Sequence, residues 1–208
     1  MCSIVAYLAD YGIKQKRAAP QYLSRYMPDS LPSSFFARPT VEVAQALLGQ
    51  TLVRRQADSS LSRYTITEVE AYTQDDPASH AYRGPSKRAA IMFGPPGMAY
   101  VYFIYGMYHC LNVVTEQDGV AGAVLIRSVQ GVNLNGPGKL CRQLGIDLSH
   151  NGLALFDSSS ALYLAPGQSP VSSQILATPR IGISKAQDRL WRYIVKGDAR
   201  DSGQNGQR

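Results

Sequence analysis

Two glutamates, Glu68 and Glu70, stand two positions apart in a stretch of β-forming residues and are candidates for acid–base chemistry. Glu70 has apolar or aromatic neighbours on both sides, and desolvation there would make its carboxylate a stronger base. The loop that follows carries His80, so an imidazole and a carboxylate could meet. A lone glutamate on a strand more often belongs to a solvated face. The pattern by itself does not choose between the two carboxylates.

An aromatic run follows, with four tyrosines within nine residues, at positions 100, 102, 105 and 108. One interpretation is a packed β core, since tyrosine is a good strand former. The other starts from Gly106, which favours a tight bend and would leave the adjacent Tyr105 exposed. An exposed aromatic side chain on a hairpin can wedge into a base stack, and stacking contributes about 1–3 kcal/mol per base. Both interpretations stay open at this point.

Arg127 ends the apolar stretch Val124–Ile126. An arginine after a buried strand can simply extend its charged end to the surface. It can also hold a phosphate, or fix a water molecule beside a carboxylate. The sequence pattern fits each of these roles.

Composition limits the kind of chemistry. The chain has 208 residues and a net charge of +6, which favours polyanionic partners such as nucleic acid. Its three cysteines and three histidines are scattered, so we expect neither a disulfide framework nor a zinc site. The apolar runs are too short for a membrane span, and the N-terminus lacks the basic start of a secretory signal. We therefore expect a reducing, intracellular location, cytoplasmic or nuclear, with no metal and no membrane contact.

The elements that must position these residues are mostly strands. A period of two over 64–72 puts Tyr64, Ile66, Glu68, Glu70 and Tyr72 on one side of a strand. The aromatic run predicts one arm and the tip of a hairpin, and further strands are expected over 120–129, 180–183 and 190–195. A short helix is expected from the proline at 137 to the glycine at 145. This pattern predicts an α+β fold with a large, mainly antiparallel sheet.

The length suits one domain. We expect a poorly defined N-terminal arm over 1–34, a single domain over 35–197, and a polar C-terminal tail over 198–208.

Several collinear segments resemble the alkyladenine (3-methyladenine) DNA glycosylase family over about residues 35 to 195. The segments that carry the resemblance are Ala37–Thr40, Glu68–Tyr72, His80–Gly84, Met92–Gly97, Tyr100–Asn112, Val124–Arg127, Asn135–Leu140 and Arg180–Ile183.

The resemblance implies a single mixed domain with a curved antiparallel sheet, flanking helices and a protruding β-hairpin that intercalates into DNA. It also implies that Glu70 is the general base and that Arg127 helps to hold the attacking water. No metal or organic cofactor is implied.

The same resemblance assigns the pocket. Tyr72, His80 and Tyr102 match residues that line the pocket for the base. Tyr105 matches the tyrosine that fills the gap left in the duplex, and Asn112 matches the asparagine that crowds the exocyclic amine of guanine.

We therefore expect a base-excision repair enzyme that flips alkylated or deaminated purines out of double-stranded DNA and hydrolyses the N-glycosidic bond. The substrates implied are 3-methyladenine, 7-methylguanine and hypoxanthine. A bifunctional enzyme would need an amine nucleophile that forms a Schiff base. No lysine is expected in the pocket motifs, and the nearest, Lys87, lies in the basic loop. The enzyme should therefore be monofunctional and leave an abasic site. We expect a monomer, and a bacterial cytoplasm as its location.

Two alternatives come from other classes. A lesion-binding module on the same fold would bind without hydrolysis, although it would not need a buried carboxylate that repels phosphate. A nucleoside hydrolase would not need an exposed tyrosine at a tip.

Overall fold

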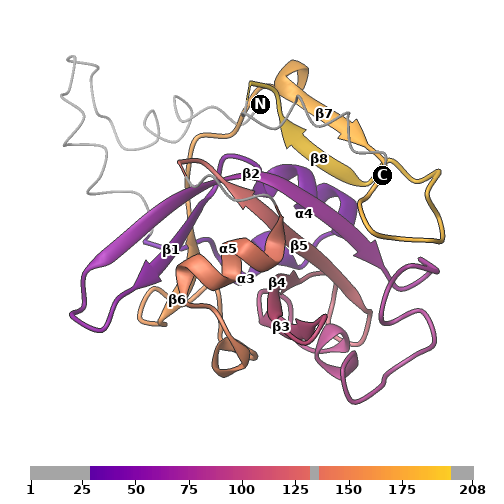
Figure 1. Cartoon of the computed structure of the whole chain (residues 1–208), viewed down its shortest axis with the longest axis horizontal. Helices are drawn as coiled ribbons and strands as arrows, with labels where there is room; N and C mark the ends of the chain where they lie inside the picture. The colour runs from indigo at the N-terminus through magenta and orange to yellow at the C-terminus, as the bar shows by residue number, and fades with distance from the viewer. Residues whose placement is uncertain (1–28, 132–135, 198–208) are drawn as a thin grey trace, which may run out of the picture.

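The long strand β2 (Leu61–Thr73) organises the sheet of the computed structural model, in which residues 29–131 and 136–197 are described. Its first half pairs with β1 (Thr51–Arg55), and its second half pairs with β5 (Gly122–Val129) and with β8 (Arg192–Val195). All these pairings are antiparallel. Figure 1 shows β2 crossing the molecule, so that it connects the two ends of the sheet.

The remaining strands extend the sheet on either side. β3 (Ala99–Ile104) and β4 (Tyr108–Val114) form a hairpin that joins β5, whereas β6 (Leu162–Ala165) pairs with β1. The order is β3-β4-β5-β2-β1-β6, and β7 (Ile175–Thr178) pairs with β8 outside this path. The described chain is thus an α+β domain with one curled antiparallel sheet, which confirms the predicted fold class.

Helices are few and short in the described part of the chain. α3 (Ser33–Phe36) and α4 (Thr40–Leu47) precede the sheet, and α5 (Pro137–Leu144) contacts β4 and β5. α5 begins at a proline and ends at Gly145, which has a left-handed backbone with φ of 62°. Glycine adopts that conformation without a Cβ clash, so the predicted ends of this helix are confirmed. Single turns of 3-10 helix lie at Ala90–Phe93, Leu148–His150 and Ser172–Gln174.

One main core holds the sheet and the helices together. Val43, Leu47 and Leu140 from the helices pack with Val69 and Ile126 from the sheet, and all five are fully buried. A smaller cluster around Met92, Tyr100 and Ala123 lies beside it. Burial of this much apolar surface supplies most of the stabilisation that fixes the strands.

The predicted alternation along β2 is wrong in part. Ile66 is fully buried in the main core together with Val69 and Ala71, and Tyr64 packs against that core. The pairing of β2 with β5 shifts register between Ile66 and Glu68 and again between Glu68 and Val69. Such a bulge moves later side chains to the opposite face, so a strict period of two fails across it.

Two further differences concern the C-terminal part. The strand expected over 180–183 is wrong, because these residues form a bend between β7 and β8. β6 and β7 have four residues each and were not predicted. The expected closing strand over 190–195 is present as β8.

The predicted arm and tail fall largely outside the described residues, which exclude 1–28 and 198–208. Leu31 packs in the main core, and its amide donates to the carbonyl of Leu164. The boundaries of the domain stay a prediction.

Candidate active site

A cavity of about 440 Å³ opens between β2, the β3–β4 hairpin, β5 and the first turn of α5. All seven side chains that the sequence singled out line it, from four different strands and two loops. They are Glu70, Tyr72, His80, Tyr102, Tyr105, Asn112 and Arg127. The sequence thus anticipated where these side chains meet, although the fold alone does not test their roles.

Glu70 lies at the wall of the cavity and is fully buried. The hydroxyl of Tyr72 donates to its Oε2 at 2.9 Å, and the backbone amide of Ile181 donates to its Oε1 at 2.8 Å. Nη1 of Arg127 lies 3.3 Å from the same Oε1. Both oxygens therefore have a fixed orientation, and the carboxylate does not point into bulk solvent.

Glu68 occupies a different environment. Its Oε1 accepts from Nε of Arg127 at 2.8 Å and from Nε of Arg192 at 2.6 Å. Burial alone would raise the pKa of Glu68, but the two arginines outweigh it and hold that pKa below its ordinary value. Glu68 does not line the cavity. Of the two carboxylates that the sequence left open, Glu70 is the one that can reach a ligand there.

A bulge in β5 explains how one arginine contacts both glutamates. Glu68 pairs with Ser128 and Val69 pairs with Ile126, which leaves Arg127 as the extra residue on β5. The extra residue of a bulge redirects a side chain, and here the guanidinium lies between Glu68 and Glu70. The two glutamates, Arg127 and Arg192 carry no net charge as a group, which suits burial.

An aromatic wall faces the carboxylate. His80 and Tyr102 meet edge to face with 4.8 Å between ring centroids, and Tyr100 lies 5.2 Å from Tyr102. The hydroxyl of Tyr100 and Nδ1 of His80 are 2.8 Å apart. Burial and the charge of Arg88 lower the pKa of His80, so the imidazole is neutral near pH 7. The wall can stack against a planar ring without adding charge.

The tyrosine hydroxyls act as donors. Burial and the neighbouring carboxylate of Glu70 raise the pKa of Tyr72 well above its ordinary value. Burial likewise raises the pKa of Tyr102, where the thiol of Cys110 is a second cause. Both phenols keep their protons at physiological pH, and the proton of Tyr72 lies in its bond to Glu70.

Asn112 closes the cavity from β4. Its Nδ2 donates to the carbonyl of Tyr100 at 3.0 Å, which fixes the orientation of the amide. The residue is buried beside Leu125, its partner in the pairing of β4 with β5. A rigid amide at this place can exclude a ligand by its bulk.

Tyr105 lies at the tip of the β3–β4 hairpin, and 77% of its surface is exposed. Its φ of 54° and that of Gly106, 68°, are both positive, and the amide of Met107 donates to the carbonyl of Ile104. The tip is therefore a tight turn that presents an aromatic ring to solvent, as the sequence predicted.

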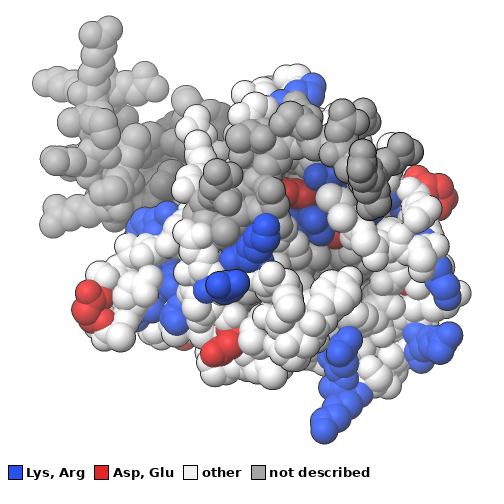
Figure 2. Space-filling view, in the orientation of Figure 1, with Lys and Arg blue, Asp and Glu red and all other residues white. Residues whose placement is uncertain are grey.

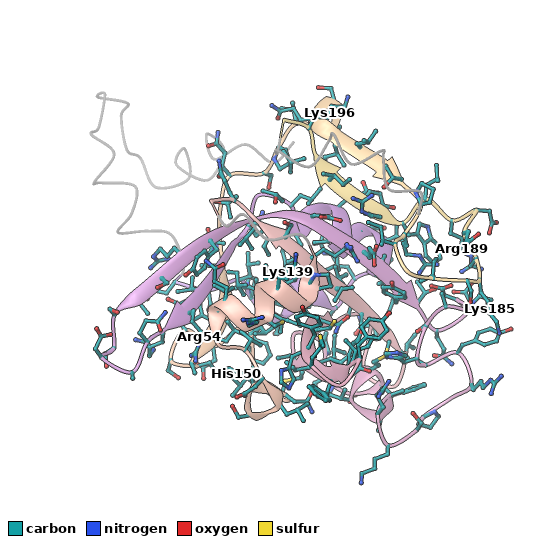
Figure 3. The ribbon with its side chains drawn as sticks, in the orientation of Figure 1. Arg54, Lys139, His150, Lys185, Arg189 and Lys196 are labelled. Carbon is teal, nitrogen blue, oxygen red and sulfur yellow. The ribbon has the colours of Figure 1, made fainter. Side chains whose placement is uncertain are left out.

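The helix α5 also contributes, which the sequence did not anticipate. A Cβ on Gly138 would lie 2.7 Å from the ring of Tyr108, so only glycine lets the first turn of α5 approach the hairpin this closely. Lys139 in the same turn lines the cavity. The expectation that no lysine lies in the pocket is therefore wrong. Figure 3 labels Lys139 near the centre of the view.

Arg180 and Asp76 were also missed. They form an ion pair in which both side chains are fully buried, and the guanidinium of Arg180 lies over the ring of Tyr72, 4.7 Å from its centroid. The two residues stand 104 positions apart, and no local pattern connects them. Residues 180–183 carry part of the family resemblance and were expected to form a strand, but neither feature suggested a role for Arg180.

The lining of the cavity includes two basic side chains, Arg127 and Lys139. On the face in Figure 2, Lys and Arg side chains are spread along the edge and across the centre, with acidic groups at fewer places. Within 29–131 and 136–197, no group of three or more His, Cys, Asp or Glu side chains is placed to hold a metal ion. Among the same residues no helix has the length and hydropathy needed to cross a membrane.

Comparison with known proteins gives one family. The family model of methylpurine-DNA glycosylase matches residues 34–199. A protein of Rickettsia felis named "Putative 3-methyladenine DNA glycosylase" is 49% identical over 172 residues, which cover 79% of this chain and 92% of the relative. Relatives with the same name from Trichodesmium erythraeum and a Wolbachia of Brugia malayi are 44% and 47% identical. They cover 81% and 79% of this chain, and 96% of each relative.

Proposed function

This chain belongs to the methylpurine-DNA glycosylase family, and from that premise we propose that Glu70 and the aromatic cavity excise damaged purines by base flipping. The protein is a DNA-3-methyladenine glycosylase, a hydrolase of base-excision repair that acts on DNA. The proposal adds which residues do the work and which lesions fit. It depends on one observation, the buried carboxylate of Glu70 held beside Arg127 at the wall of an aromatic cavity.

The chemistry follows from the transition state. Cleavage of an N-glycosidic bond builds positive charge on the sugar, as in other glycoside hydrolyses. The carboxylate of Glu70 stabilises that charge and takes a proton from the attacking water. Arg127 helps to hold the water, since its Nη1 lies 3.3 Å from Oε1 of Glu70. The hydroxyl of Tyr72 and the amide of Ile181 keep the carboxylate in place.

The leaving group determines which lesions react. An alkylated purine such as 3-methyladenine or 7-methylguanine is cationic and leaves readily, whereas hypoxanthine needs a proton. A cationic or electron-poor base stacks well on electron-rich rings, which Tyr72, Tyr102 and His80 supply. Asn112 excludes guanine by crowding its exocyclic amine.

Access to the base requires flipping. A nucleotide that rotates out of the duplex loses a few kcal/mol of stacking and pairing, and the cost is lowest at damaged pairs. Tyr105 fills the vacated space and keeps the flipped state populated. Its exposure at the tip of a tight turn supports this role.

The enzyme is monofunctional in this proposal. Glu70 with a bound water accounts for hydrolysis without a Schiff base, which an amine nucleophile would form. Lys139 is the lysine that could compete, because it lines the cavity. Borohydride treatment during turnover tests this point, and a trapped enzyme–DNA adduct that disappears in Lys139→Gln would contradict monofunctional chemistry.

One assay tests the function as a whole. The protein is incubated with duplex DNA containing 3-methyladenine, 7-methylguanine or hypoxanthine, and released base is separated and measured. We expect free base and an abasic site from the duplex, and none from the free nucleosides. Binding without release would indicate a lesion-binding module, and release from nucleosides would indicate a nucleoside hydrolase.

The setting of the enzyme is part of the proposal. Glu70, Arg127 and the aromatic side chains that line the cavity all come from one chain, so we propose that the protein acts as a monomer. We also propose that the enzyme acts inside the cell, where its DNA substrate is.

A further inference from the structure

Both oxygens of Glu70 accept a hydrogen bond, and the two donor residues both adjoin one buried arginine, Arg180. Oε2 accepts from the hydroxyl of Tyr72, and Oε1 accepts from the amide of Ile181. The guanidinium of Arg180 lies over the ring of Tyr72, 4.7 Å from its centroid. Arg180 is also the residue directly before Ile181, so its side chain fixes the backbone that carries the second donor.

The guanidinium of Arg180 is held by a backbone carbonyl and by both oxygens of a carboxylate. Nη1 donates to the carbonyl of Ala71 at 2.9 Å and to the carboxylate of Asp76. Nη2 donates to the other oxygen of Asp76 at 3.1 Å. Both side chains of this pair are fully buried, and the ring of Trp191 lies 5.4 Å from the guanidinium. A forked pair of this kind fixes direction as well as distance.

These contacts connect the bend at 180–183 to the end of β2. Ala71 lies between Glu70 and Tyr72 on β2, and Asp76 begins the loop that leads to His80. The bend is irregular and carries no strand pairing of its own. The contacts of Arg180 with Ala71 and Asp76 hold the bend, and with it the amide of Ile181, against the end of β2.

We propose that Arg180, with Asp76 as its counter-ion, is a positioning residue that holds the two hydrogen-bond donors of the Glu70 carboxylate. This inference rests on the proposed function, because it gives Glu70 the role of the base. It assigns no contact with DNA to Arg180, which is 5% exposed and acts through Tyr72 and Ile181.

The chain offers a matched control. Arg189 also lies over the ring of Trp191, at 4.6 Å, and pairs with the neighbouring Asp75 at 3.2 Å. It contacts neither Ala71 nor Tyr72, and it is labelled at the edge of the molecule in Figure 3. Arg189→Met therefore removes a charge, an ion pair and a ring contact from the same region without touching the donors of Glu70.

Two variants test the inference. Arg180→Lys keeps the charge opposite Asp76, but an ammonium group cannot reproduce the planar fork. The double variant Arg180→Met with Asp76→Asn removes both charges, so no unpaired charge is left buried. Two quantities are measured in each protein: hydrogen exchange of the Ile181 amide by NMR, and the single-turnover rate of base release from duplex DNA carrying hypoxanthine.

We expect the Ile181 amide to exchange at least about 10-fold faster in both variants, because its acceptor is no longer aligned. Base release should slow by about 10- to 100-fold, since small displacements of a catalytic group have effects of that size. Affinity for the lesion-bearing duplex should change little, and Arg189→Met should leave all three quantities unchanged.

Other outcomes separate the two proposals. An Ile181 amide that stays protected in both variants would overturn the inference, whether or not base release slows. Faster exchange with an unchanged rate of base release would support the positioning by Arg180 and contradict the role of Glu70 in the proposed function.

Discussion

Arg127 and Glu70 face each other across the paired strands β5 and β2, with 3.3 Å between Nη1 of the arginine and Oε1 of the glutamate. The same guanidinium donates through Nε to Glu68. One arginine therefore orients two carboxylates that differ in surroundings, since only Glu70 lines the cavity. The first two predictions separate the functions of these carboxylates.

Glu70→Gln should lower the single-turnover rate of base release by about 10²- to 10⁴-fold, the usual contribution of a general base. The amide keeps the size of the side chain but accepts no proton from water. Affinity for lesion-bearing DNA should persist, because the change removes a negative charge. Glu42→Gln, an exposed change on α4, is the control. Near-normal turnover of Glu70→Gln would mean that another group is the base.

Glu68→Gln should act on stability and on its pH dependence. Removal of a buried partner of two arginines should lower the free energy of unfolding at pH 7 by about 3 kcal/mol. The pKa of Glu68 is lowered in the folded protein, so its stabilisation is present above its ordinary pKa and is lost as the pH falls through the folded value.

Urea unfolding of both proteins between pH 7 and pH 3 measures this dependence. The two stabilities should converge as the solution is acidified. A difference that stays constant over the whole range would contradict an ionised Glu68.

Tyr105→Ser should weaken capture of the lesion. Loss of the ring removes stacking worth about 1–3 kcal/mol, and affinity for the lesion-bearing duplex should fall by about 10-fold. Stability should stay within about 0.5 kcal/mol, because the side chain is 77% exposed. Tyr82→Ser, at another exposed tyrosine, is the control. Fluorescence of 2-aminopurine beside the lesion reports unstacking, and an unaltered signal would argue against wedging.

Asn112→Ser should relax the exclusion of guanine. The smaller side chain leaves room for the exocyclic amine, and release of guanine from undamaged duplex should rise by about 10-fold. Asn151→Ser is the control, since the side chain of Asn151 also has a hydrogen bond to the backbone of β3, in which its Oδ1 accepts from the amide of Val101. Equal guanine release by both variants would show that a general loss of packing, and not the loss of the steric exclusion by Asn112, causes the release.

The sequence predicted those parts of the molecule that depend on local pattern. The hairpin follows from the aromatic run with a bend at Gly106, and α5 follows from its proline and glycine ends. The site residues were predicted from the resemblance to a known family. The motifs that carry it lie close together in the fold, and Glu70, Tyr102 and Arg127 line one cavity.

The rest depends on contacts between distant segments. The pairing of β2 with β5 has two irregularities: the register shifts between Ile66 and Glu68, and Arg127 is an extra residue on β5. Both arise from how two strands pair, which neither strand shows alone. The pair of Asp76 and Arg180 joins a loop to a bend and leaves no periodic signal. The short strand β7 has only four residues, Ile-Leu-Ala-Thr, and shows no alternation of apolar and polar side chains that would mark it as a strand.

The hairpin tip has a further consequence for how this sequence can evolve. Positive φ at both Tyr105 and Gly106 puts the tyrosine in the left-handed backbone region, which glycine, asparagine and aspartate normally occupy. An aromatic residue in that backbone region destabilises the folded state by about 1 kcal/mol. On the proposed role, selection for stability alone would replace this tyrosine, and selection for lesion capture retains it. At the tip, the residue that would best stabilise the fold thus differs from the residue that would best serve lesion capture.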